Sequence, residues 1–240
     1  MVERITGSAD GWEDMDTILL EDIGFEVDLE ALYSRLRLKP GSGYVDAVRQ
    51  LALEGQALAR PKAVYGMASV GARGDDWVEI EGIGFASRVL RVNLDRAYRV
   101  FPYVATCGTE LEEWANSKDD LLERFWAEAL QEQALSLARR ALSEDVQERF
   151  HPGSVSRMSP GSLDDWPLEQ QAPLFALLGD VQSAVGVRLT ESFLMLPAKS
   201  VSGILFPTEE SFENCMLCPR EGCPGRRAPY TQELYDRYRL

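Results

Sequence analysis

Three cysteines lie within nine residues towards the C-terminal end of the sequence, at Cys215, Cys218 and Cys223. A Cys-x-x-Cys pair places two thiolates on one tight turn, and a third thiolate nearby supplies most of a tetrahedral zinc site or of an iron–sulfur ligand set. Cys107, which comes directly after a predicted strand, is a candidate for the fourth ligand. The spacing is compatible with an iron–sulfur cluster, with zinc, or with no metal.

Three arginines flank these thiols, at Arg220, Arg226 and Arg227. Their guanidinium groups would offset thiolate charge or form a docking patch for an acidic redox partner. The simpler interpretation is that all three are solvated surface residues.

A second group of residues with chemical potential is the segment 157–163, with the sequence Arg-Met-Ser-Pro-Gly-Ser-Leu. The planar fork of Arg157 would hold a carboxylate through two charge-assisted hydrogen bonds. Gly161 lets the backbone approach a ligand that a β-carbon would exclude. Taken alone, this pattern is more typical of an ordered loop packed on a hairpin.

Two further stretches of sequence change the interpretation of this segment. Residues 189–197 read Leu-Thr-Glu-Ser-Phe-Leu-Met-Leu-Pro, and residues 200–203 read Ser-Val-Ser-Gly. Together with the 157–163 loop they resemble the activation domain of cobalamin-dependent methionine synthase, in which an Arg-x-x-x-Gly-Tyr loop binds S-adenosylmethionine. The resemblance covers residues 157–206, is faint over 107–142 and is very weak before that.

This resemblance implies a ligand site. Arg157 would meet S-adenosylmethionine, with further contacts near Ser159, Gly161 and Ser162, and Glu132 would be the acidic group that faces the ligand's ammonium or sulfonium. The chain departs from the family at Ser162, where the family has Tyr, and Trp166 is a candidate replacement for that aromatic ring.

The resemblance also implies a function, the reductive reactivation of a corrinoid-dependent methyltransferase that supports methionine synthesis. S-adenosylmethionine would supply the methyl group, and the chain would act as a methyltransferase component. Cobalamin would be carried by a partner, because the chain lacks an Asp-x-His-x-x-Gly motif and its one histidine, His151, lies in a predicted loop.

The expected partner is a split methionine synthase or another corrinoid-binding methyltransferase, with a flavodoxin- or ferredoxin-type electron donor. Two alternatives stay open. The chain could be a non-catalytic cap or chaperone of a corrinoid protein, or an electron-transfer protein built around the cysteines.

The charge of the chain limits its partners. The sequence has 39 acidic and 25 basic residues and a formal net charge of −14, which disfavours nucleic acid because phosphate backbones bind clustered Lys and Arg. No apolar run approaches the roughly 20 residues that span a bilayer, so no membrane contact is expected. The first residues, 1–5, show no apolar signal core, and a cytoplasmic location is the default expectation.

The helices and strands that the sequence predicts must position these residues. Their order indicates one α+β domain, with a twisted, mostly antiparallel sheet and helices packed around it. The expected parts are N-terminal helices over 1–60, a sheet and ligand-binding core over 61–206, and a cysteine-containing extension over 207–240. Helices are predicted at 29–38, 44–59, 117–142, 174–185 and 229–240, and strands at 63–68, 77–80, 99–106, 187–195 and 200–206.

Three predictions concern single residues within these elements. Ser117 should cap the longest helix, in which Leu122 and Phe125 would lie on the apolar face. Pro102 should mark an edge strand or a bulge. Glu191, on the predicted strand 187–195, should be a buried, hydrogen-bonded structural organiser and not a ligand.

Overall fold

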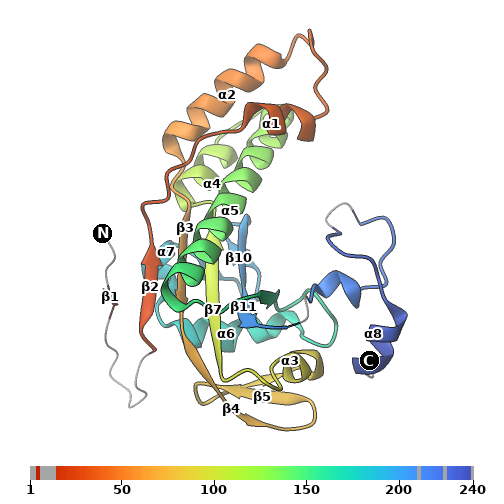
Figure 1. Cartoon of the computed structure of the whole chain (residues 1–240). Helices are drawn as coiled ribbons and strands as arrows, with labels where there is room; N and C mark the ends of the chain where they lie inside the picture. The colour runs from red at the N-terminus through yellow and green to blue at the C-terminus, as the bar shows by residue number, and fades with distance from the viewer. Residues whose placement is uncertain (1–3, 6–14, 210–211, 224–225, 239–240) are drawn as a thin grey trace.

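Short segments rich in β-branched and aromatic residues form most of one antiparallel sheet. The computed structural model describes residues 4–5, 15–209, 212–223 and 226–238, and within them nine strands join this sheet (Figure 1). They are β1 (Arg4–Ile5), β2 (Thr17–Leu20), β3 (Lys62–Gly66), β4 (Ala68–Arg73), β5 (Trp77–Ile80), β6 (Ile83–Ala86), β7 (Arg99–Thr106), β8 (Val155–Met158) and β11 (Ser200–Pro207). Every pairing is antiparallel, and the predicted α+β class is confirmed.

Strand β7 is the centre of the sheet. Strands β3 and β4 pair with one of its edges and β11 pairs with the other, so the prediction of an edge or a bulge at Pro102 is wrong. The missing N–H of Pro102 falls between the β3 ladder, which ends at Tyr103, and the β4 ladder, which begins at Val100. A proline is tolerated there because the ladder is interrupted at that point.

The two faces of the central strands are covered by different helices, because successive side chains of a strand point to opposite faces. Tyr65, Tyr103 and their alternate neighbours pack against Ala138 and Leu142 of α5 (Leu121–Phe150). Val64 and Val104 instead pack with α7 (Val181–Val185) and the end of α6 (Gln171–Leu178). The sheet is therefore a buried layer between helices.

A second core lies beyond the end of the sheet, among the N-terminal helices (Figure 1). These helices are α1 (Leu29–Arg35), α2 (Val45–Leu58) and α4 (Thr109–Asn116), which pack on the first half of α5. Trp126, Ala127 and Leu130 of α5 are buried among them. The predicted helices 29–38 and 44–59 are confirmed.

The long helix begins later and ends later than predicted. Asp120, and not Ser117, is its N-cap, because the Asp120 carboxylate accepts the N–H groups of Leu122 and Glu123. Ser117 instead ends α4, which the sequence did not predict. Phe125 is exposed, as is Leu122, so the predicted apolar face is wrong in its first turn.

Two predicted elements are broken into shorter ones. The helix over 174–185 is two helices, separated at Gly179, whose φ is +75°. The strand over 187–195 is two short strands, β9 (Arg188–Leu189) and β10 (Met195–Leu196), which form a separate hairpin. Residues 71–73, which lie between the predicted strands 63–68 and 77–80, belong to β4.

The C-terminal segment packs into the main core. Phe212, Leu217 and Tyr238 are buried in the same cluster as Trp166 and Met158. The segment contains the short helical turn Asn214–Met216 and α8 (Gln232–Tyr238), which lies beside α3 (Arg88–Asn93) (Figure 1). A further helical turn, Leu168–Gln170, precedes α6. None of the described helices is long and apolar enough to cross a membrane.

Candidate functional site

Arg157 lies on β8, opposite Leu205 of β11. Its neighbours Ser156 and Met158 are buried, whereas Arg157 itself is half-buried, because alternate residues of the strand face opposite sides. The guanidinium therefore emerges from the sheet beside the core and is not inside it.

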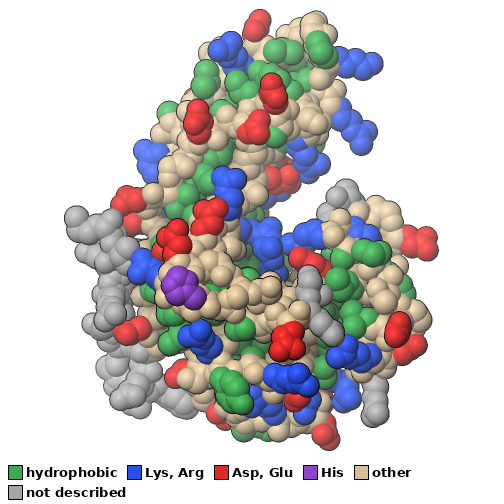
Figure 2. Space-filling model, in the orientation of Figure 1, with side chains coloured by type: hydrophobic (Ala, Val, Ile, Leu, Met, Phe, Trp, Pro, Cys, Tyr) green, Lys and Arg blue, Asp and Glu red, His purple; other side chains and the backbone are tan. Residues whose placement is uncertain are grey.

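Arg157 belongs to a group of polar and charged side chains from four parts of the chain. Burial lowers the pKa of Arg139 on α5, and Tyr103, Arg157, Arg227 and Glu213 all act on it electrostatically. Figure 2 shows Lys and Arg side chains in the hollow between the helical part of the molecule and the C-terminal segment. Several guanidiniums in one hollow favour an anionic ligand group such as a carboxylate.

Two polar atoms of this group are incompletely paired among the described residues. The Nε of Arg139 is buried and has no hydrogen-bond partner. The buried Oε2 of Glu213 lies 3.3 Å from the Arg227 Nε in an ion pair, without the geometry of a hydrogen bond. Such unsatisfied buried groups are rare in a closed core, and they mark a place where a ligand could complete the hydrogen bonding.

A tight turn comes directly after Arg157. The N–H of Ser162 donates to the carbonyl of Ser159 at 3.2 Å, with Pro160 and Gly161 in the two central positions. Gly161 has φ +77°, as the third position of a type II turn requires, and a β-carbon there would also come within 2.8 Å of Leu168 Cδ1. The turn is thus fixed. The N–H of Gly161 also donates, to the carbonyl of Trp166 at 2.7 Å, so the groups that the exposed Gly161 and Ser162 offer to a ligand are their carbonyls.

A cavity of about 720 Å³ adjoins this turn. One wall is formed by residues 162–165, and the other by residues 217–220 together with Tyr235 of α8. Its volume lies in the range of small-molecule sites. The sequence did not predict this cavity, because its two walls are more than fifty residues apart along the chain.

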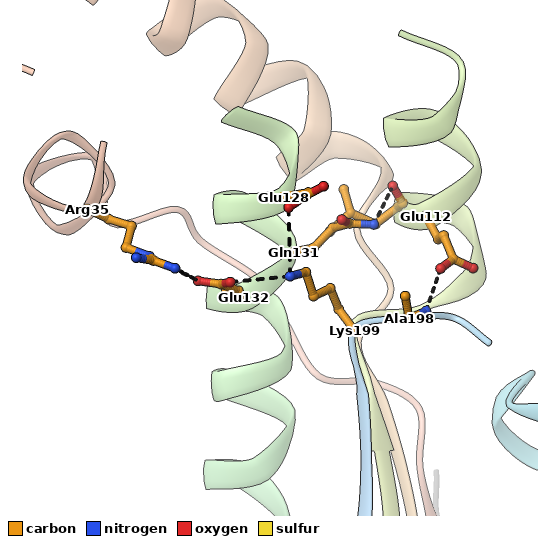
Figure 3. Close-up of polar contacts among 8 residues, drawn as sticks. Arg35, Glu112, Glu128, Gln131, Glu132, Ala198 and Lys199 are labelled. Carbon is orange, nitrogen blue, oxygen red and sulfur yellow. Dashed lines mark hydrogen bonds and ion pairs between the residues drawn. The ribbon is translucent and has the colours of Figure 1, made fainter. Parts of the chain in front are cut away.

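Glu132 is placed elsewhere, among ion pairs that join three elements (Figure 3). Its carboxylate accepts from Arg35 of α1 at 2.9 Å and from Lys199, just before β11, at 3.3 Å. Lys199 is also 4.0 Å from Glu128. Arg139 is seven residues, roughly 10 Å, further along α5. The structure therefore does not bring Glu132 into contact with the 157–162 segment.

Glu191 and Trp166 also differ from their predicted settings. Glu191 is exposed in the turn between β9 and β10, so the buried strand position that suggested an organising role is wrong. Thr190 holds that turn, because its Oγ1 accepts the N–H of Leu194 at 3.0 Å. Trp166 is fully buried against Phe85 and cannot present a ring at the surface.

The four cysteines are free thiols, and they are not assembled into one site. Among the described residues, no three His, Cys, Asp or Glu side chains are grouped so as to hold a metal ion. Cys107 is fully buried in the helical core, where burial raises the pKa of its thiol to about 12. Cys215, Cys218 and Cys223 are half-buried in the C-terminal segment.

Arg226 organises that segment. Its guanidinium donates to the carbonyls of Cys215 and Cys218 at 2.9 Å each, and also to those of Arg220 and Ala228. Both terminal nitrogens of this guanidinium thus face the backbone of its own segment, which gives Arg226 a structural role there. Arg227 does act on a thiol, since its N–H and its charge lower the pKa of Cys215 against the opposing effect of burial.

Comparisons with known proteins agree with this geometry. Residues 155–215 match the family described as "Vitamin B12 dependent methionine synthase, activation domain". The structure is similar to the crystal structure of the MetH reactivation domain bound to AdoHcy, with a TM-score of 0.59 and 17% sequence identity over 84% of this chain and 82% of that chain. No curated protein sequence matches the chain. The predicted resemblance is thus confirmed: the chain has the fold of the methionine synthase reactivation domain, and its residues 155–215 carry the sequence pattern of that activation-domain family.

Proposed function

We propose that the chain binds S-adenosylmethionine and presents its methyl group to the cobalt of a cobalamin carried by a partner protein. One observation carries the proposal: the half-buried Arg157 and the partly exposed turn 159–162 lie side by side inside the segment that matches the activation-domain family. The similar solved structure is of a reactivation domain bound to AdoHcy, the demethylated form of this ligand.

The residues fit the amino-acid end of such a ligand. The guanidinium of Arg157 would hold the carboxylate through paired hydrogen bonds, and Arg139 adds a second buried donor that lacks a partner among the described residues. The carbonyls of the exposed Gly161 and Ser162 would be the backbone groups that contact the ligand, because their N–H groups already donate to Trp166 and Ser159. We propose that Ser159 also contacts the ligand.

The chemistry needs no proton-transfer residue. Transfer would take the methyl group from the sulfonium to the reduced cobalt of the partner's cobalamin, whose electron pair would form the new bond, and would leave a neutral thioether. The protein would contribute by orienting the ligand and by balancing a positive charge that disappears during the transfer. A corrinoid-binding methyltransferase would be the partner, a flavodoxin- or ferredoxin-type protein the electron donor, and the cytoplasm the location.

Titration calorimetry with S-adenosylmethionine tests the binding step. The wild-type chain should bind, Arg157→Ala should weaken binding by tenfold or more, and Arg157→Lys should restore only part of it, because an ammonium cannot replace the paired donors. Arg96→Ala is the matched control, since Arg96 is 89% exposed. Absence of binding to the wild-type chain contradicts the proposal.

A second experiment tests the transfer. With ¹⁴C-methyl-labelled S-adenosylmethionine, chemically reduced cobalamin and the wild-type chain, label should appear on cobalamin faster than without the chain, and Arg157→Ala should remove the difference. Binding without transfer would instead favour a non-catalytic cap of a corrinoid protein.

A further inference from the structure

The cavity beside the 159–162 turn is bounded on one side by the C-terminal segment. Ser162 and Asp164 lie on its first wall, and Cys218, Arg220 and Tyr235 lie on its second. The turn after Arg157 therefore adjoins only one wall of an open pocket, and the segment after residue 212 provides the other wall.

The second wall is held in place firmly enough to form a site. Leu217 is buried in the main core, and Tyr238 is buried three residues after Tyr235. The guanidinium of Arg88 donates to the Tyr238 carbonyl at 2.8 Å, and the N–H of Thr231 donates to the Met216 carbonyl at 2.9 Å. These contacts fix both parts of the wall to the rest of the fold.

The lining of the cavity combines an aromatic ring, apolar surface and hydrogen-bonding groups. Tyr235 is its one aromatic lining residue among the described residues, half-buried, with its ring centroid 6.2 Å from that of Tyr230. An aromatic ring of this kind can stack on a purine. Leu163 and Pro219 add apolar surface, and Arg220 adds donors.

The two aspartates of the first wall differ in what they can do. The carboxylate of Asp165 already accepts the N–H groups of Arg88 and Val89 and the hydroxyl of Ser87, and so it caps α3. Asp164 is exposed on the cavity side and is the carboxylate that can accept the hydroxyls of a ribose.

We propose that this cavity binds the adenosine part of the ligand, with Tyr235 stacked on the adenine and Asp164 bonded to the ribose hydroxyls. The C-terminal segment, and not the 159–162 turn alone, then determines which nucleoside is accepted. This inference rests on the proposed function, because it divides one ligand between Arg157 at the amino-acid end and Tyr235 at the nucleoside end.

Two probes separate the ends of the ligand. S-adenosylhomocysteine carries both ends, whereas 5′-methylthioadenosine carries the nucleoside and thioether but no amino-acid group. Calorimetry on the full chain should show that Tyr235→Ala weakens both probes by about tenfold, as expected for loss of one stacked ring. Tyr235→Phe should bind both like the wild type, and Asp164→Asn should weaken both by about fivefold.

Arg157→Ala should give the opposite pattern, with weaker binding of S-adenosylhomocysteine and unchanged binding of 5′-methylthioadenosine. Tyr98→Ala is the matched control, because Tyr98 is 87% exposed and does not line this cavity. The thermal midpoint of each variant should stay within a few degrees of the wild type, which separates a lost contact from a lost fold.

The outcomes distinguish the inference from the function on which it rests. If Tyr235→Ala binds both probes as the wild type does while Arg157→Ala loses S-adenosylhomocysteine, the nucleoside lies elsewhere and the inference is overturned, but the proposed function stands. If the wild-type chain binds neither probe, the proposed function fails with it.

Discussion

Gly203 of β11 lies directly against Ser159, the first residue of the turn after Arg157. A β-carbon on Gly203 would come within 2.8 Å of the Ser159 Oγ, within 2.4 Å of the Met158 carbonyl and within 3.0 Å of the Tyr103 hydroxyl. Only glycine allows β8 and its turn to approach the central strands this closely. Close packing against β8 therefore explains the glycine at the end of the Ser-Val-Ser-Gly motif.

Gly203→Ala should therefore move the 157–162 segment as well as destabilise the fold. We expect a loss of about 2 kcal/mol in the free energy of unfolding, because backbone atoms cannot move aside as side chains can. Gly84→Ala is the matched control on β6, since nothing lies within 4 Å of its β-carbon. Equal urea midpoints for the two variants would show that β8 has room to shift.

Much of the central fold could be predicted from the sequence, because its elements are marked by local pattern. Strands β7 and β11 are buried on both faces and read as nearly continuous apolar runs. Helix α2 lies between Gly43 and Pro61, both of which disfavour helix. The Arg157–Gly161 segment could be predicted too, since a turn with Pro and Gly in its centre is set by adjacent residues.

The remaining features depend on contacts distant in sequence. Ser117 and Asp120 are both good N-cap residues, and only packing decides which of them caps α5. The Thr190 hydroxyl accepts the N–H of Leu194 four residues on, and this turn ends β9. Tyr235 and Ser162 line the same cavity although 73 positions separate them in the sequence, and no local pattern relates the two.

Glu132→Gln should leave the affinity for S-adenosylmethionine within twofold of the wild type. Both carboxylate oxygens already have cationic partners in Arg35 and Lys199, so a ligand ammonium would have to displace one of them. The carboxylate is 40% exposed, and the effect on stability should stay below about 1 kcal/mol. Glu128→Gln, one turn away, is the control, and a tenfold loss at Glu132 alone would identify this residue as a ligand contact.

The chain should lose stability as the pH rises above 10. Burial and the hydrogen bond to Asp145 raise the pKa of Tyr65 above its ordinary value, so the folded state holds this proton more tightly than the unfolded state does. The stabilisation that protonated Tyr65 contributes to folding is fully present below pH 10. Above pH 10 it falls by up to about 1.4 kcal/mol per pH unit. Urea unfolding between pH 8 and 11 should show this slope in the wild type and in Tyr98→Phe, but a flatter one in Tyr65→Phe.

The thiols should react in a defined order with iodoacetamide at pH 7.5. Cys215 should be alkylated first, because backbone N–H groups and the charge of Arg227 lower its pKa and increase its thiolate fraction. Cys107 should react last, since it is fully buried with a raised pKa. Peptide mapping by mass spectrometry gives the order, with Cys215→Ser as control. Joint protection of Cys215, Cys218 and Cys223 by added zinc or iron would instead reveal a metal site that forms on binding.

Helix α5 has 30 residues, a length of about 45 Å, and it contributes to two cores. Its first half, with Trp126 and Leu130, is buried among the N-terminal helices, and its second half, with Leu142 and Val146, is buried against the sheet. Neither core can melt without exposing one end of the same helix. The two should accordingly lose structure in a single calorimetric transition, with the helical part unable to persist as a separately folded remnant.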